Sequence, residues 1–494
     1  MKKFNLILAV VTSIAFTVSC SEDSLELSNP NQLLPDTFFQ NPVQVQSAVN
    51  AVYANLQTRG LYSRHMFFMM DNMSHENGGN TQLEADKRQY LDFSFDSSHG
   101  AIGAYWDSCY RGINKANFVI ENSDKINAIL SSVMSDIDKQ KFIGEAKFLR
   151  ALYNFFLVTR FGDIPLVVAL PPDDGVGPAK NTKAEIYGQI ITDLQAAIPA
   201  LLNKGEEEEG RANKGAAQAL LGKVYLFLEQ YDDALAQFNA LSGYELEDNY
   251  FDNFKEETEH GVESIFEIQY NDDLGTSAQW NSSVSGAGPN EATFRGQEYG
   301  FNDWFNVFPS DNLLNEYEDD DIRFEQSFWV NGQMFAGGTL LVDHFPSNGG
   351  GNAGWSKYCN YYKDVNEDQT SGINFKYLRY ADVLLMMAEC ESMRAGGSQD
   401  VAAGLIDQVR TRAGLASIGT GLSESQIFEA LVHERKVELA GEQTRFNDII
   451  RWGNAATELA GTNFVAGKHE LFPIPQSEID SNINIGSEDQ NPGY

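Results

Sequence analysis

Residues 215–244 read GAAQALLGKVYLFLEQYDDALAQFNALSGY, and this stretch predicts two helices joined by a short turn. Leu221, Gly222 and Tyr225 lie at helical spacing before the turn, and Ala234 and Phe238 follow it on one face. The small residues Gly222 and Ala234 let two helix backbones approach closely, while the aromatic rings fill the groove between them. The stretch therefore predicts a tightly packed helical hairpin.

The spacing Leu-Gly-x-x-Tyr followed by Ala-x-x-x-Phe is similar to that of a tetratricopeptide unit. Gln218 and Leu246 depart from that pattern. A similar pair of helices is predicted at 380–391 and 402–413. The chain is therefore expected to be mainly α, with tetratricopeptide-like helical pairs as its scaffold.

Helical periodicity also occurs in the segments 43–56, 106–121, 137–161 and 186–201. The strongest of them, 137–161, has one continuous apolar face. Gly162 and Pro165 should end it, because glycine adopts the left-handed conformation that closes a helix and proline lacks the N–H that would continue it.

Between residues 245 and 374 helical periodicity weakens, and Gly, Asn, Ser and aromatic residues become frequent. Short strand-like pieces occur at 264–269 and 339–342. Long irregular segments of compact domains tend to carry function. We therefore expect helical parts at 33–244 and 375–494 to pack as one compact unit, which supports a large loop-rich, ligand-binding region at 245–374 with a few short strands.

The first residues have the features of an export signal: Lys2 and Lys3, an apolar run from Phe4 to Phe16, and then Cys20. The run is too short to span a bilayer, so we expect a signal peptide at 1–19 with lipid attached to Cys20. Thr17 stands where a lipid-attachment site prefers Leu, and an ordinary secretory signal is the alternative. The polar residues 20–32 should form a lipidated, flexible tether.

Length and charge limit the class of protein. The chain has 494 residues, of which 42% are hydrophobic, enough for one large domain or two closely packed ones. A net charge of −35 disfavours binding to nucleic acid. Cys109, Cys359 and Cys390 are too scattered for a disulfide framework or a paired metal site, so we expect them to be buried as small hydrophobic residues.

Short blocks of distinctive sequence follow one another along nearly the whole chain after the tether. They are 144–153 (GEAKFLRALY), 160–167 (RFGDIPLV), 377–389 (YLRYADVLLMMAE), 409–414 (VRTRAG), 434–442 (ERKVELAGE) with Arg445, Asp448 and 451–453 (RWG), 471–475 (LFPIP) and 490–494 (QNPGY). In this order they resemble the SusD/RagB-like family of outer-membrane lipoproteins from Bacteroidetes-type bacteria.

The resemblance implies a fold and a function. It implies tetratricopeptide-like helical pairs that support an irregular region, and a lipid anchor in the outer membrane that faces the cell exterior. It further implies a non-catalytic protein that captures oligosaccharides, or peptides in the RagB branch, and delivers them to a SusC-like TonB-dependent transporter.

The residues themselves contain no catalytic motif. His433-Glu434 does not continue as His-Glu-x-x-His, and neither a Gly-x-Ser-x-Gly elbow nor a P-loop occurs. With 70 acidic residues, the spacing of carboxylates alone leaves a glycosidase pair open. Cofactors are not expected, apart from a weak structural Ca²⁺ candidate.

That candidate is Asp364, Asn366 and Asp368, whose spacing can place three oxygens around Ca²⁺. Gln369 and Phe375 depart from the EF-hand pattern. A polar turn is therefore the simpler interpretation.

Charged residues alternate at helical spacing near the end of the chain: Glu438, Glu442, Arg445, Asp448 and Arg451. On one helical face they would form an internal ion-pair network. A ligand clamp is the alternative.

Aromatic residues carry the prediction of ligand binding, because a sugar presents an apolar C–H face that stacks on an exposed aromatic ring beside polar groups. Trp106 and Trp452 lie in helical blocks and are expected in the core. Trp280, Trp304, Trp329 and Trp355, together with Tyr299, lie in the irregular region and are the candidate platforms.

A second candidate is the polar stretch 71–80, in which Asp71, Asn77 and Asn80 could bond to sugar hydroxyls. The sequence thus favours a glycan-binding protein. Peptide capture and a purely structural repeat adaptor are the alternatives.

Overall fold

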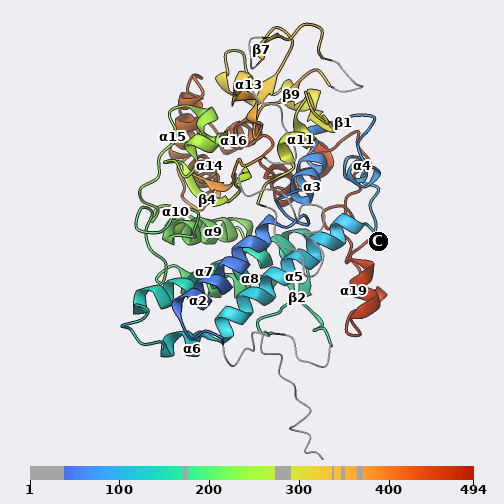
Figure 1. Cartoon of the computed structure of the whole chain (residues 1–494). Coiled ribbons are helices and arrows are strands. Elements are labelled where there is room, and N and C mark those ends of the chain that lie inside the picture. The colour runs from blue at the N-terminus through green and yellow to red at the C-terminus, as the bar shows by residue number, and fades with distance from the viewer. Residues whose placement is uncertain (1–37, 171–175, 273–290, 336–338, 346–350, 364–370) are drawn as a thin grey trace, which may run out of the picture.

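The computed structural model describes residues 38–170, 176–272, 291–335, 339–345, 351–363 and 371–494. Figure 1 shows helices in the lower half of the molecule, and above them a loop-rich region beside a second group of helices. The predicted architecture, mainly α with helical pairs supporting an irregular region, is confirmed.

The lower helices are α2 (Pro42–Ala54), α5 (Gly100–Glu121), α6 (Ser123–Ala128), α7 (Asp136–Phe161), α8 (Lys183–Ala197), α9 (Lys214–Phe227) and α10 (Tyr231–Phe238). Helix α7 packs against both α5 and α8 and is buried along most of its length. It begins at Ser135, whose side chain accepts the Asp138 N–H at 3.1 Å. It ends at Gly162, whose φ of +71° suits glycine, and β2 (Ile164–Pro165) follows and pairs with β3 (Lys180–Asn181).

Helices α9 and α10 form the hairpin predicted from residues 215–244. Gly222 lies directly against the Phe238 ring, since a Cβ on this glycine would lie 2.4 Å from Phe238 Cε1. Ala234 is fully buried in the same contact region. The expected mechanism, small residues that admit an aromatic ring between close helices, is confirmed.

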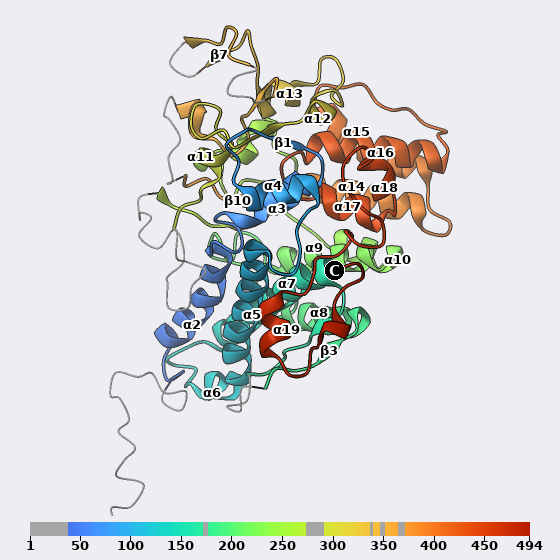
Figure 2. The ribbon, with the colours of Figure 1, turned by 90° about the vertical axis from the view of Figure 1, so that its right-hand side faces the viewer.

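A second group of helices is formed by the C-terminal part: α14 (Tyr380–Met393), α15 (Gln399–Arg412), α16 (Glu424–Glu438), α17 (Arg445–Arg451), α18 (Ala455–Glu458) and α19 (Gln476–Ser481). Helices α14 and α15 are the second predicted pair, and α14 also packs on α10, so the two pairs stack. Helix α19 returns to the lower layer beside α5 (Figure 2), where Trp106 Nε1 donates to Glu478 Oε2 at 3.3 Å. Trp106 is buried, as predicted.

The irregular region consists of short elements: η4 (Tyr250–Phe254), η5 (Glu256–Thr258), β4 (Ser264–Ile268), α11 (Arg295–Tyr299), β5 (Val307–Pro309), α12 (Asp311–Leu314), α13 (Ile322–Ser327), β6 (Phe328–Trp329), β7 (Met334–Phe335), β8 (Thr339–Leu340), β9 (Gly354–Trp355) and η8 (Asn360–Lys363). Strand β6 pairs with β9 and β7 pairs with β8, both antiparallel. Strand β4 pairs with β10 (Phe375–Arg379), which leads directly into α14.

Part of the N-terminal half lies with the irregular region rather than with the lower helices. Helices α3 (His65–Met73) and α4 (Ala85–Asp92) stand beside α11 in Figure 1. Strand β1 (Asn77–Gly79) pairs with β5, with Gly78 opposite Phe308. The loop-rich surface is therefore built from two stretches of chain, and the boundary expected at residue 244 does not separate them in space.

The three described cysteines Cys109, Cys359 and Cys390 are buried, as expected. Among the described helices, none is apolar over a length that would cross a bilayer.

Candidate ligand-binding surface

A group of aromatic rings surrounds Phe301 in the upper, loop-rich part of the molecule. Five rings have centroids between 5.0 and 6.2 Å from the Phe301 centroid, namely Trp329, Phe335, His344, Phe345 and Tyr361. We call these six residues the aromatic cluster. Most of the contacts are edge to face, an arrangement that rings prefer to direct stacking. The cluster thus forms a fixed apolar floor built from segments far apart in the sequence.

The outer side of the aromatic cluster carries exposed apolar residues. Met334, Leu340 and Val342 are 58%, 51% and 64% exposed. Trp329 is half-buried beside Phe335, with ring centroids 5.6 Å apart, and its indole Nε1 has no hydrogen-bond partner. Exposed apolar side chains next to the aromatic cluster along the chain make this region the candidate binding surface.

Trp304 lies on the loop that leaves the aromatic cluster and is 38% exposed. Gly300 lets this loop lie close against the Tyr361 hydroxyl, because a Cβ at this position would lie only 2.4 Å from that oxygen. That hydroxyl donates to Asp303 Oδ2 at 2.8 Å and accepts the Asn302 N–H at 3.0 Å. The indole therefore projects from a loop whose backbone is fixed on both sides.

Asn80 has a different role from the one predicted. Its side chain is buried, and its Nδ2 donates to the carbonyl oxygens of Trp304, at 3.3 Å, and of Phe305. Its own N–H donates to the Asn306 carbonyl at 3.1 Å. Asn80 thus positions the Trp304 loop from below, and direct contact with a ligand on this surface is excluded by its burial.

The structure contradicts the expectation that Trp355, Tyr299, Asp71 and Asn77 face a ligand. All four are at most 2% exposed. Trp355 Nε1 donates to Asn77 Oδ1 at 2.9 Å, and the Tyr299 hydroxyl donates to Asp71 Oδ2 at 2.8 Å. The stretch 71–80 is not a polar surface loop, because it forms the end of α3 and the strand β1 and its polar groups bond to one another inside the fold.

Two carboxyl groups in this buried network have raised pKa values. Burial raises the pKa of Asp71 to about 6, against the opposing effect of the Arg295 guanidinium. Burial, and then repulsion from Asp71, raise the pKa of Glu76 to about 8. Glu76 Oε1 has no hydrogen-bond partner. The network is therefore a structural element beneath the binding surface, in which two neighbouring buried carboxyl groups resist ionisation.

Several predicted residues lie outside the described part of the chain: the platform candidate Trp280, the lipid-attachment residue Cys20, and the Ca²⁺ candidates Asp364, Asn366 and Asp368.

The charged residues near the C-terminus form the expected internal ion-pair network. Arg379 contacts Glu438 at 2.5 Å and Glu442 at 2.6 Å, and Arg451 contacts Asp448 at 2.9 Å. The expectation of one continuous helical face is wrong, because α16 ends at Glu438 and α17 begins at Arg445. Between them the chain turns at Gly441, with φ +67°, where a Cβ would lie 2.9 Å from the Trp355 ring.

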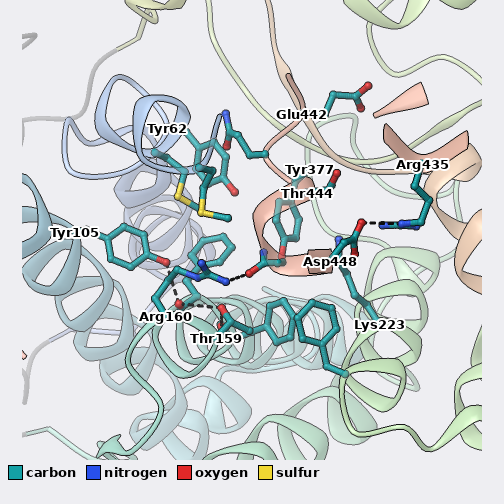
Figure 3. Close-up of a pocket in the computed structure, with 17 residues that line it drawn as sticks. Tyr62, Tyr105, Thr159, Arg160, Lys223, Tyr377, Arg435, Glu442, Thr444 and Asp448 are labelled. Carbon is teal, nitrogen blue, oxygen red and sulfur yellow. Dashed lines mark hydrogen bonds and ion pairs between the residues drawn. The ribbon is translucent and has the colours of Figure 1, made fainter. Parts of the chain in front are cut away.

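The cavities discussed next suit a sugar less well than the surface at the aromatic cluster does. The one in Figure 3, between α5, α7 and α17, has a volume of about 30 Å³, which is room for a single water. Burial lowers the pKa of Arg160, which lines it, to about 10. Two open hollows of about 350 and 480 Å³ lie beside Tyr110 on α5 and beside the acidic run 318–321. Neither hollow contains an exposed tryptophan.

Sequence reasoning found Trp304 and Trp329 but missed Phe301, Phe335 and His344. Their only signal was the frequency of aromatic residues in the irregular region, since the contacts that join them are made between distant segments.

Comparison with protein families gives two matches. Residues 262–463 match the SusD family, and residues 23–226 match a family described as starch-binding and associating with the outer membrane. Together these segments include most of both helical groups and much of the irregular region.

Individual proteins are similar over most or all of this chain. SusD-like protein P2 of Formosa agariphila is 28% identical, with all of both chains covered. The starch-binding protein SusD of Bacteroides thetaiotaomicron is 23% identical over 73% of this chain and 74% of that protein.

Solved structures agree with the fold. A laminarin-binding SusD-like protein is 26% identical with a TM-score of 0.75, covering 92% of this chain and 100% of that one. A SusD superfamily protein from Bacteroides vulgatus, 24% identical, has a TM-score of 0.78 and covers 93% of this chain and 100% of its own.

Proposed function

Because this chain belongs to the SusD/RagB-like family, we propose that it binds oligosaccharide or polysaccharide at the aromatic cluster and the Trp304 loop. The single observation that carries this proposal is the exposed Trp304 indole, 38% accessible on a fixed loop beside an apolar floor. The family match to starch-binding proteins and the 26% identical laminarin-binding structure support the class of ligand.

The chemistry of the surface suits a neutral sugar. A pyranose ring stacks its C–H face on an indole and leaves its hydroxyls at the edge, where polar groups can reach them. Here Trp329 offers a half-buried ring. Asn331, two residues further along the chain, holds the neighbouring loop in place, because its Nδ2 donates to the Phe345 carbonyl at 2.6 Å and its Oδ1 accepts the His344 N–H at 2.8 Å. The exposed apolar side chains around them exclude water from the contact.

We propose a role without catalysis. One matched family is described as starch-binding, and two of the similar proteins, SusD of Bacteroides thetaiotaomicron and the laminarin-binding structure, are named for what they bind. Bound glycan would be handed to a SusC-like TonB-dependent transporter. The lipid attached to Cys20 would hold the protein on the outward face of the outer membrane, and support for this placement comes from the export-signal pattern and from the description of the matched family.

Replacing Trp304 tests the proposal. Trp304→Ala should weaken binding of laminarin or starch oligosaccharides about fivefold to tenfold, since one aromatic contact contributes about 1 kcal/mol. Titration calorimetry measures the change, with Ile137→Ala as control, because Ile137 is also an exposed apolar residue (64%) and lies at the start of α7, away from this surface. Unchanged glycan affinity, or binding of a peptide panel and no glycan, would reject the proposal.

A further inference from the structure

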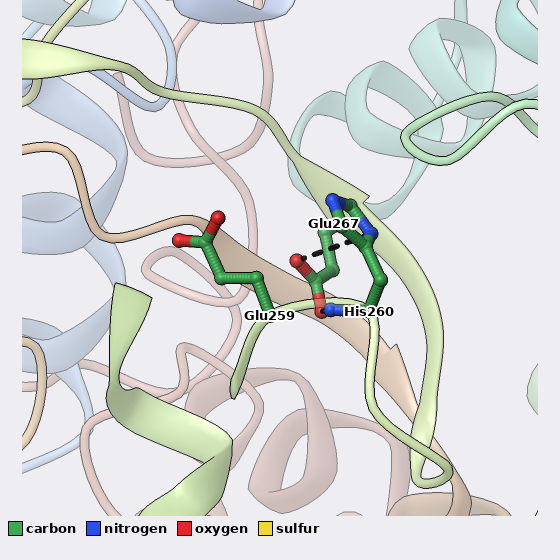
Figure 4. A group of neighbouring side chains, drawn as sticks. All are labelled: Glu259, His260 and Glu267. Atoms are coloured by element: carbon green, nitrogen blue, oxygen red, sulfur yellow. Dashed lines mark hydrogen bonds and ion pairs between the residues drawn. The ribbon is translucent and has the colours of Figure 1, made fainter. Parts of the chain in front are cut away.

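A compact group of metal-ligating side chains lies where the chain passes from η5 into β4, and none of them belongs to the aromatic cluster. Glu259 and His260 follow η5 directly, and Glu267 lies on β4. One ligand atom from each of the three lies within 4.8 Å of the other two (Figure 4). The group thus combines an imidazole with two carboxylates in one place.

The two oxygens of Glu267 have separate surroundings. Oε1 accepts from Lys376 Nζ at 2.7 Å and from the His260 N–H at 3.0 Å, so it is engaged. Oε2 accepts from Asn374 Nδ2 at 3.0 Å and faces His260 Nδ1 at 3.6 Å. The side chain is completely buried, whereas the His260 ring is 22% exposed. An ion entering from the His260 side therefore meets Oε2 without displacing Lys376.

Glu259 is a carboxyl group that lacks a strong counter-charge. Its Oε1 accepts the Asn374 N–H at 2.7 Å. A dication beside this carboxylate would supply the opposite charge.

A cavity leads to the group, and one of the carboxylates that line this cavity has an unsatisfied oxygen. The cavity of about 220 Å³ is lined by His260, Glu267 and Glu207, and Lys204 and Arg211 also reach it. The Glu207 side chain is only 3% exposed; its Oε1 pairs with Lys141 at 2.9 Å, while its Oε2 is buried with no hydrogen-bond partner. An unsatisfied buried carboxylate oxygen requires a donor or a cation.

We propose that Glu259, His260 and Glu267 bind one divalent transition-metal ion, with zinc as the best fit, and that water from the cavity completes its coordination. One imidazole and two carboxylates suit zinc, whereas Ca²⁺ and Mg²⁺ prefer oxygen ligands alone. Ligands of tetrahedral zinc lie about 3.3 Å apart, so His260 and Glu267 are close to this spacing and Glu259 needs a movement of about 1 Å.

The ion would join the loop 259–263 to the β4–β10 pair. That pair is where the irregular region leaves the helical scaffold and returns to it. The role is structural, and it is independent of glycan binding at the aromatic cluster.

Calorimetry of the full-length protein with Zn²⁺, after treatment with a chelator, tests the proposal. We expect one ion per chain with a Kd below about 10 µM and no competition from equal Mg²⁺ or Ca²⁺. His260→Asn should weaken binding at least tenfold, and asparagine tolerates the φ of +57° found there. Glu259→Gln should weaken it similarly.

His433 supplies the matched control. It also contacts two glutamates, Glu316 through Nδ1 at 2.8 Å and Glu318 through Nε2 at 3.2 Å, but through opposite ring nitrogens that one ion cannot join. His433→Asn should leave zinc affinity unchanged. The proposal is overturned if the wild type shows no saturable zinc binding, if His260→Asn and Glu259→Gln bind as tightly as wild type, or if His433→Asn loses as much affinity as they do.

Discussion

Replacing Glu76 with glutamine should stabilise the protein at neutral pH and change little near pH 4. Glu76 is 1% exposed, and its Oε2 has only two contacts, with Ser74 Oγ at 3.2 Å and the Gly441 N–H at 3.4 Å. Folding places this carboxyl next to Asp71 and away from water, so the folded protein holds the proton of Glu76 more tightly than the unfolded chain does.

The size of the effect follows from the change in pKa from an ordinary 4.5 to about 8. A raised carboxyl pKa contributes stability that is fully present below the unfolded value and is lost as the pH rises from 4.5 through 8. At neutral pH the loss amounts to about 3 kcal/mol of unfolding free energy. Glutamine is neutral at every pH in this window, so Glu76→Gln removes the loss.

Urea unfolding at several pH values between 4 and 8 measures the prediction. The variant should match wild type at the acidic end and exceed it increasingly toward pH 8. Glu429→Gln, which alters an exposed glutamate on α16, should follow the wild-type curve throughout. Parallel curves for Glu76→Gln and wild type across the whole range would show that the buried carboxyl does not resist ionisation, and the reasoning would be refuted.

Three further substitutions probe the scaffold. Gly222→Ala should lower the unfolding free energy by about 1–3 kcal/mol in thermal melts, because its Cβ would overlap the Phe238 ring. Gly188→Ala on α8, where nothing lies within 4 Å of the added carbon, should instead stabilise by about 0.5–1 kcal/mol, and the same sign for both would contradict the packing described. Arg379→Met should cost about 3–5 kcal/mol in urea unfolding, because Glu438 and two other buried glutamates each lose one of their cationic partners, and a cost below about 1 kcal/mol would show that the network is solvated.

The helical scaffold could be predicted because its signals are local. The pairing of Gly222 with Phe238 is encoded within one hairpin, and Gly162 ends α7 through its own backbone preference. The break between α16 and α17 was missed, although Gly441 offered a sign of it, because charged residues on both sides continued the helical spacing.

The binding surface was only partly predictable because burial there is decided by distant contacts. Trp355 and Trp304 have similar polar neighbours in the sequence, yet one is fully buried and the other is 38% exposed. Trp355 is held inside the fold by a residue far away in the sequence, because its Nε1 donates to Asn77, 278 residues away along the chain. Composition can propose aromatic candidates, but it cannot choose among them without that pairing.

The antiparallel pairing of β4 with β10 has a consequence for how such proteins diversify. Ile268 lies opposite Phe375, so the chain departs for the long insertion and comes back at hydrogen-bonded neighbours. An insertion whose ends already meet can change in length and sequence at little entropic cost, because closing a longer loop adds only about 0.6 kcal/mol per doubling. Residues 269–374 can therefore be regarded as a segment that can be replaced without rebuilding the helical scaffold. A replacement segment with a new ligand specificity would also need a matching strand at Asn77–Gly79. That strand lies in the N-terminal part of the chain and pairs with β5 inside the replaced segment.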